Sequence, residues 1–209
     1  IKTKVAIGKL SLDFPKRLVL ENVYFEDQRK DTLLYGGKLR VDISLFKLLS
    51  NEVDVQYLEL DDMRANIYRI APDTSFNYDY IVKAFAGEQT QPATPADTTN
   101  PMKFNIGKIV LNRITATFKD DETGNNVYFY LGNFQTRIKT FDPAHLIYNI
   151  PEIQVSDVNT RINQYKPLIE NKDSTATVAS PATSASTPQL QLGNISFKRI
   201  AFDYKNDIS

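Results

Sequence analysis

Three short segments of the chain share one pattern of apolar and polar positions. They are Val5–Leu12, Phe104–Leu111 and Leu190–Phe197, and each alternates apolar with other residues around a central glycine. Alternation with a period of two predicts a β-strand that has one buried face. A glycine inside such a strand is typical of a bulge or bend, where the pattern can change face. These segments therefore predict three interrupted strands, and the rest of the chain is organised between them.

Similar alternation predicts most of the remaining structure. Polar turns are predicted at residues 27–31 and 120–126, because both are rich in turn-forming residues. Gly36-Gly37 is predicted to form a tight hairpin. The predicted strands are Thr3–Leu12, Arg17–Glu26, Thr32–Tyr35, Lys38–Ile43, Glu52–Leu60, Arg64–Ile70 and Val127–Leu131.

Two segments favour short helices over strands. Leu45, Leu48 and Leu49 lie at helical spacing after Ser44, which could serve as an N-cap. Residues 77–86 place an apolar residue at i, i+3, i+4 and i+7, which gives one apolar stripe. We expect both helices to cap the sheet.

The strands recur as a repeat. Gly107, Arg113, Lys119 and Asp121 fall opposite Gly193, Arg199, Lys205 and Asp207 without a gap. Likewise, Gly37, Ile43, Phe46, Asp62 and Ile67 fall opposite Gly132, Ile138, Phe141, Asp157 and Ile162. We therefore predict a first β unit at 1–86, a second at 102–171 and the start of a third at 189–209, and we expect the chain to be a piece of a longer repetitive protein. The stretches at 87–101 and 172–188, rich in Thr, Ala, Ser and Pro, are predicted to be flexible linkers.

Composition narrows the function classes. The 25 basic residues balance the 25 acidic residues, which argues against nucleic acid as a partner because its binders need basic patches. No cysteine is present, so the sequence predicts neither disulfides nor thiolate metal sites. Tyrosine and phenylalanine are abundant, as pleated sheets prefer.

Candidate catalytic residues are few. The acidic pairs at Asp61-Asp62 and Asp120-Asp121 lie where turns or strand ends are predicted, and acid–base catalysis would need two carboxyl groups in different environments around a cleft. His145 is the only histidine, and no neighbour in the sequence completes a metal site or a nucleophile–base pair. We therefore expect no enzyme activity, no cofactor and no metal.

The first unit resembles the AsmA/TamB-like family, and in particular the start of the periplasmic part of TamB-type proteins of Bacteroides-like bacteria. The segments that carry the resemblance are Gly8–Leu12, Arg17–Asp27, Asp31–Tyr35, Leu39–Leu49, Leu58–Asp62 and Phe76–Ile81. The resemblance extends over residues 1–85 and more loosely over the second unit.

This resemblance implies a fold and a role. The implied fold is mainly β, with repeated antiparallel sheet units that form a curled trough (β-taco-like) and short capping helices. The implied protein is anchored in the inner membrane upstream of this segment and lies in the periplasm. Its apolar groove would shelter or conduct phospholipid for outer-membrane assembly or homeostasis. The implied partners are phospholipid acyl chains, an outer-membrane assembly protein and neighbouring repeats of the same chain.

Several residues are predicted to line an apolar groove or a closed core, and the sequence leaves open which. They are Ile7, Leu20, Leu39, Val41, Val55, Leu60, Ile109, Phe129 and Phe134. An open groove can shelter acyl chains because each buried methylene contributes about 0.8 kcal/mol. Two other functions stay open: an envelope scaffold that binds another protein by edge-strand addition, and a carbohydrate-binding sandwich with an aromatic platform.

Overall fold

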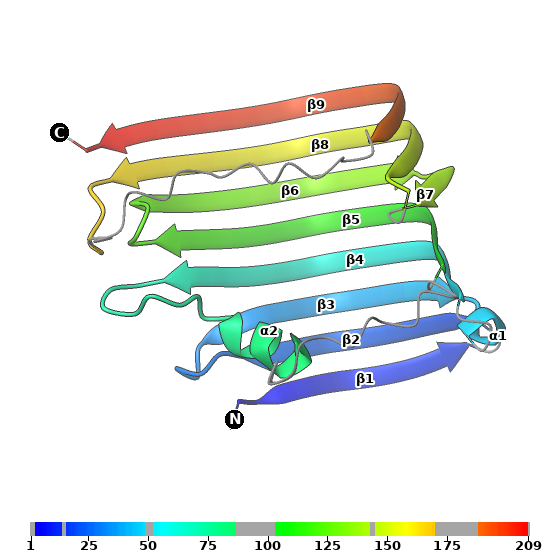
Figure 1. Ribbon diagram of the computed structural model, residues 1–209, viewed down its shortest axis with the longest axis horizontal. Helices are drawn as coiled ribbons and strands as arrows, with labels where there is room; N and C mark the ends of the chain where they lie inside the picture. Colours follow the sequence, from blue (N-terminus) through cyan, green and yellow to red (C-terminus); the bar gives the residue numbers. More distant parts are fainter. Residues whose placement is uncertain are drawn as a thin grey trace.

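The computed structural model describes residues 3–13, 16–48, 52–86, 103–142, 145–169 and 188–208. These residues form one open sheet of nine strands with two short helices (Figure 1). The predicted fold class, mainly β with short helices, is therefore confirmed, and the open sheet is consistent with a curled trough. The predicted linkers at 87–101 and 172–188 lie almost wholly outside the described residues.

The strands lie side by side in nearly their chain order. The sheet order is β1-β2-β3-β4-β5-β6-β8, and both β7 and β9 pair with β8. The strands are β1 (Val5–Asp13), β2 (Arg17–Glu26), β3 (Thr32–Ile43), β4 (Glu52–Arg69), β5 (Lys103–Asp120), β6 (Asn125–Arg137), β7 (Thr140–Asp142), β8 (Ile147–Tyr165) and β9 (Gln189–Asp207).

The sheet is mixed, whereas the prediction was antiparallel. β4 pairs with β5 in parallel, and β8 pairs with β9 in parallel, while all other pairs are antiparallel. Parallel neighbours need a long crossover connection, since the chain must return to the starting end of the sheet. The two predicted linkers fall within those connections, which explains why they interrupt the repeat at equivalent places.

Two predicted strand boundaries are wrong. β3 runs unbroken through Gly36-Gly37, so no hairpin forms there, and β4 runs unbroken from Glu52 to Arg69 instead of dividing near Asp61. In both cases the residues that looked like breaks are accommodated inside a paired strand. The turns at residues 27–31 and 120–126 and the strand at Val127–Leu131 are confirmed.

Both predicted helices are confirmed: α2 begins two residues later than predicted, and Leu49 of the first predicted helix lies outside the described residues. The helix α1 spans Leu45–Leu48, and its Lys47 binds two carboxylates at the start of β4, those of Glu52 at 3.0 Å and Asp54 at 2.9 Å. The helix α2 spans Asp79–Ala86 and lies in front of β2 and β3 in Figure 1. The Tyr80 hydroxyl donates to the Glu26 carbonyl at 2.6 Å, which ties α2 to the end of β2.

One row of residues crosses the whole sheet with an unusual backbone. The pairing register is the same on both sides of these residues, so they lie opposite one another on neighbouring strands. We call this row the bend row, and its members are Gly8, Asn22, Gly37, Asp62, Arg113, Gly132, Asp157 and Arg199. Every member that is not glycine has φ between +53° and +60°, the left-handed region. Such residues disturb the alternation of side chains along a strand, as a bulge does.

The bend row changes which residues share a face. Arg113 binds both Asp61 and Asp62, at 2.5 and 2.7 Å, although neighbours in a regular strand point to opposite faces. Tyr35, two rows away, donates to Asn22 of the bend row at 3.0 Å. The bend row, the row of Asp61 and the row of Tyr35 therefore lie on one face of the sheet. The apolar rows on either side of the bend row lie together on the other face.

Several residues that match in the sequence repeat occupy corresponding places in the sheet. Gly37 and Gly132 both lie in the bend row, as do the matched pairs Asp62 with Asp157 and Arg113 with Arg199. Gly107 and Gly193 are also equivalent, because each lies against a parallel neighbour, at Gln56 and Pro151. Gly8 differs from these two glycines: it lies in the bend row, so the first of the three cassettes has a different place in the sheet.

Candidate functional site

The largest candidate site is the apolar face of the sheet, which we define by four rows. Two rows lie on one side of the bend row: Leu12, Leu18, Val41, Leu58, Ile109, Thr136, Ile153 and Ile195, then Leu10, Leu20, Leu39, Leu60, Leu111, Phe134, Val155 and Phe197. Two lie on the other side: Ile7, Val23, Gly36, Met63, Ile114, Leu131, Val158 and Ile200, then Val5, Phe25, Leu34, Ala65, Ala116, Phe129, Thr160 and Phe202.

This apolar face is largely open. Among the described residues, the only buried hydrophobic side chains are Val23, Leu33 and Leu131. Most other apolar side chains of the inner strands are half-buried, and those on β1 and β9 are exposed, with Phe197 at 66% and Leu10 at 64%. Monomeric proteins rarely expose an apolar surface of this extent without using it.

Eight of the nine predicted groove residues lie on the apolar face. Leu20, Leu39, Leu60 and Phe134 share one row, Val41 and Ile109 share the next, and Ile7 and Phe129 lie beyond the bend row. Val55 belongs to none of the four rows, and it pairs with Ile43 and Ile106. The structure therefore brings most of the predicted set onto one surface and leaves Val55 at its margin.

One end of the apolar face is covered by the connection after β4. The ring of Phe76 stacks on Tyr78 at 5.3 Å and contacts Phe118 of β5 at 5.8 Å. The Arg69 guanidinium lies over the Phe76 ring at 4.6 Å. Phe76 of this connection therefore covers part of the surface near β4 and β5.

The opposite face is polar and carries ion pairs. Arg40 binds Glu59, Lys38 lies 3.4 Å from Glu21, and Asn133 donates to Asn112 at 2.8 Å. Charged and polar side chains are well hydrated, so this face can stay exposed to solvent. One face of the sheet is therefore apolar and the other is polar.

Each parallel junction carries the same ion pair in the bend row. Arg113 of β5 binds Asp62 of β4, and Arg199 of β9 binds Asp157 of β8. In each pair the arginine lowers the pKa of the aspartate carboxyl. These pairs are exposed, so water screens the charges and each pair is expected to contribute little to the stability of its junction.

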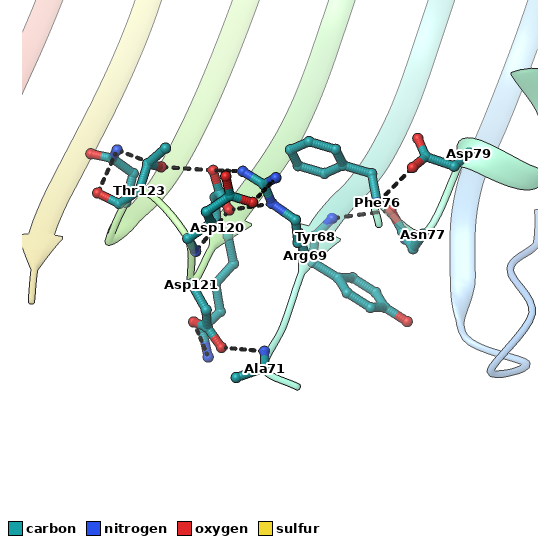
Figure 2. Close-up of polar contacts among 12 residues, drawn as sticks. Tyr68, Arg69, Ala71, Phe76, Asn77, Asp79, Asp120, Asp121 and Thr123 are labelled. Atoms are coloured by element: carbon teal, nitrogen blue, oxygen red, sulfur yellow. Dashed lines mark hydrogen bonds and ion pairs between the residues drawn. The ribbon is translucent and has the colours of Figure 1, made fainter. Parts of the chain in front are cut away.

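The acidic residues of the β5–β6 turn are structural. Arg69 binds Asp120 through two hydrogen bonds of 2.8 Å, and Thr123 donates to the same carboxylate at 2.7 Å (Figure 2). These contacts, the Arg69 pair first, lower the pKa of Asp120 to about 2. Asp120 is only 2% exposed, and its buried carboxylate holds Arg69 of β4 against this turn.

The neighbouring Asp121 joins two further segments, the end of β8 and the segment that follows β4. It accepts hydrogen bonds from the Tyr165 hydroxyl at 2.6 Å and from the Ala71 amide at 2.9 Å, and it is 1% exposed. Burial opposes its ionisation, but these donors outweigh burial, and the pKa of Asp121 is lowered. Burial of the Tyr165 hydroxyl, and then its hydrogen bond to Asp121, raise the pKa of Tyr165.

A matching cluster holds the β2–β3 turn. Asp27 is 1% exposed and accepts bonds from Tyr68, from Asn77 at 3.3 Å and from the amides of Arg29 and Asp31 at 2.9 Å each. Asn77 also binds the backbone of β4 at Tyr68, which carries the chain from the sheet into α2 (Figure 2). The sequence predicted the acidic turns. It did not predict that Asp27, Asp120 and Asp121 would be the most buried large side chains among the described residues.

His145 and the potential metal ligands were the other candidates for chemistry in the sequence. His145 lies in a turn, as predicted, and its Nδ1 is 2.7 Å from Asp142 on an exposed surface. No group of three or more potential metal ligands occurs within the described part of the chain. Within the same residues, no helix has the length and apolar character needed to span a bilayer.

Comparison with known proteins does not assign the chain to a family: no family model and no curated protein matches it. The resemblance to the AsmA/TamB-like family thus rests on the sequence segments quoted above.

Proposed function

We propose that this chain is a non-enzymatic segment of an envelope protein, anchored in the inner membrane, that shelters phospholipid acyl chains on its apolar face in the periplasm. The single observation that carries the proposal is the open apolar face itself. Four apolar rows span eight neighbouring strands, and a row of polar bends holds them all on one side of the sheet. Acyl chains laid on this face would bury apolar surface on both partners.

The geometry suits a conduit better than a single-ligand pocket. The apolar rows run across the strands without a charged residue, so a chain can shift along a row and keep similar contacts. Adjacent strands lie about 4.8 Å apart, and each row therefore offers a series of similar, closely spaced sites. Repetition of the unit would extend the same surface.

Photo-crosslinking at two neighbouring residues tests this function. Phe129 lies on the apolar face, whereas Tyr128 lies on the polar face, under the Arg161 guanidinium at 4.6 Å. A photoreactive residue at position 129 of the protein in cells is expected to capture phospholipid, detectable by mass spectrometry. The same residue at position 128 is the matched control and should capture none.

Capture at neither position, or equal capture at both, contradicts the proposal. Protein captured at position 129 in place of lipid would favour the second candidate function, an envelope scaffold that binds another protein by strand addition. That candidate has its own supporting observation, since among the described strands β1 and β9 each pair with one neighbour.

A further inference from the structure

The polar face of the sheet contains a hollow over β2, β3, β4 and β5. Its volume is about 510 Å³, which lies within the range of about 300–1,000 Å³ that small-molecule sites occupy. We call it the tyrosine hollow, and the side chains that line it are Tyr24, Thr32, Tyr35, Arg64, Asn66 and Thr115. The Arg64 side chain is exposed and the other five residues are half-buried.

The strand register brings these side chains together. Tyr24 pairs with Tyr35, Tyr35 with Arg64, and Arg64 with Thr115, so these four residues form one row of the polar face. Asn66 lies in the next polar row along β4, and a bulge between β2 and β3 places Thr32 in that row as well. The backbone ladder of four strands therefore fixes the shape of the tyrosine hollow.

Arg64 gives the tyrosine hollow a positive charge. Within the described residues its guanidinium forms no hydrogen bond and no ion pair, whereas Arg40 and Arg69 each bind a carboxylate. Arg113 first, and Arg64 more weakly, lower the pKa of Asp62, but Arg113 already binds both oxygens of that carboxylate, at 2.7 and 2.9 Å. None of the described residues that line the hollow is acidic, so its charge is complementary to an anion.

The other lining groups favour a ligand with flat apolar faces and many hydroxyl groups. The two half-buried tyrosines combine an apolar ring with a polar tip. The hydroxyls of Tyr24 and Thr115 form no hydrogen bond within the described part of the chain, so they are available to a ligand. Asn66, by contrast, is held in place, because its amide donates to the Thr32 carbonyl at 2.9 Å.

We propose that the tyrosine hollow binds an acidic saccharide, with the sugar carboxylate on Arg64 and the sugar rings against Tyr24 and Tyr35. The planar guanidinium matches the two oxygens of a carboxylate. The C–H groups on the face of a pyranose ring pack against aromatic rings, while the sugar hydroxyls both donate and accept hydrogen bonds. Each of these contacts has a counterpart in the hollow.

The same row is long enough for several sugar units. It continues from Thr115 to Tyr130 of β6, and Tyr130 matches Tyr35 in the repeat that also matches Gly37 with Gly132. Adjacent strands lie about 4.8 Å apart, close to the length that one sugar unit adds to an extended glycan. A glycan that lies across the strands can therefore contact a tyrosine on either side of Arg64.

Two alternatives fit less well. A nucleic acid carries a phosphate on every unit, but the row from Tyr24 to Tyr130 contains a single cation, Arg64. A second hollow of about 350 Å³ on the polar face includes Arg161, but Asp203 pairs with Arg161 there and would repel a carboxylate. The proposal therefore concerns the tyrosine hollow alone.

Calorimetric titration of the purified full-length protein tests the ligand class. The probes are hexasaccharides of galacturonic acid, of mannuronic acid and of hyaluronan. We expect at least one of them to bind saturably. Its methyl-esterified form keeps the sugar rings but lacks the charge, so its Kd should be higher by at least about tenfold.

Paired variants test the residues. Arg64→Gln should raise the Kd by at least about tenfold. Arg137→Gln is the matched control and should leave the Kd unchanged, since it removes the same charge from the same face but lies in the row of Asp42, away from the hollow. Tyr24→Leu should raise the Kd by about tenfold, whereas Tyr24→Phe keeps the ring and should have a smaller effect. An unchanged urea midpoint shows that each variant is folded.

Three results would overturn the inference. They are no saturable binding of any of the three hexasaccharides, equal effects of Arg64→Gln and Arg137→Gln, and Arg64-dependent binding of phosphatidylglycerol vesicles without binding of a hexasaccharide. The inference does not rest on the proposed function, because the tyrosine hollow lies on the face opposite the apolar rows. Lipid capture at position 129 is measured separately, so the two failures are distinguishable.

Discussion

Gly132→Ala is expected to lower the free energy of unfolding by about 3 kcal/mol, the upper end of the usual cost of overpacking. The new Cβ would lie 2.5 Å from the Asp157 Cβ and 3.3 Å from the Asp157 carbonyl oxygen. β6 lies between β5 and β8, so the backbone cannot move away without breaking a ladder of hydrogen bonds. Equilibrium unfolding in urea measures the change as a lower transition midpoint.

Two control variants separate this clash from a general effect of replacing glycine. Gly36→Ala also meets a close neighbour, Met63 Sδ at 2.6 Å, but a flexible side chain can move, so we expect a loss below about 1 kcal/mol. Asp157→Gly combined with Gly132→Ala removes the clashing Cβ and should recover most of the stability. Equal losses for the two single alanine variants would contradict the steric account of the bend row.

Asp120→Asn is the second change with a large expected effect, a loss of about 3 kcal/mol, because it leaves a part-buried guanidinium without its main partner. The Asp120 carboxylate accepts two hydrogen bonds from Arg69 and one from Thr123, and it is 2% exposed. The amide that replaces it is neutral and can accept through only one oxygen. Urea unfolding again gives the readout.

An exposed ion pair of similar geometry provides the control. Asp157 accepts two hydrogen bonds from Arg199, but both side chains are well exposed, at 43% and 67%. Asp157→Asn should therefore shift the urea midpoint much less than Asp120→Asn does. A loss as large as that of Asp120→Asn would show that burial is not what makes the Asp120 pair strong.

The same carboxylate predicts a pH dependence. The pKa of Asp120 is lowered to about 2 in the folded chain, below its ordinary unfolded value of about 3.9. The folded state binds this proton less readily, so the contribution of Asp120 is fully present above about pH 4 and is lost as the pH falls toward 2. Asp120→Asn should flatten the stability profile between these values, and an unchanged profile would contradict the role of Asp120.

The strands and helices were largely predictable from local pattern. Period-two alternation located β1, β2 and the central part of β6, and an i, i+3, i+4, i+7 stripe located α2. Each of these signals arises from one segment with one buried side, so no distant residue is needed to read it. The repeat was also visible, because equivalent strands need the same residues at the same bends.

The prediction failed where a local signal had two meanings. Gly36-Gly37 is a hairpin signal in isolation, but in the structure Gly37 faces the left-handed residues Asn22 and Asp62 on its two neighbours. The gap in the apolar pattern at Asp61-Asp62 suggested the end of a strand, but the strand continues and only its facing changes. A single strand contains no information about which residues its neighbours place opposite these positions.

Local patterns in the amino-acid sequence are enough to predict a mainly β chain whose apolar residues share strand faces. They do not predict that the bends of eight strands fall in one row and keep the apolar residues on one open face. Nor do they predict that Asp27, Asp120 and Asp121 are buried or that two junctions are parallel. Alternation is a property of one strand, whereas register, facing and burial are set by the neighbouring strands.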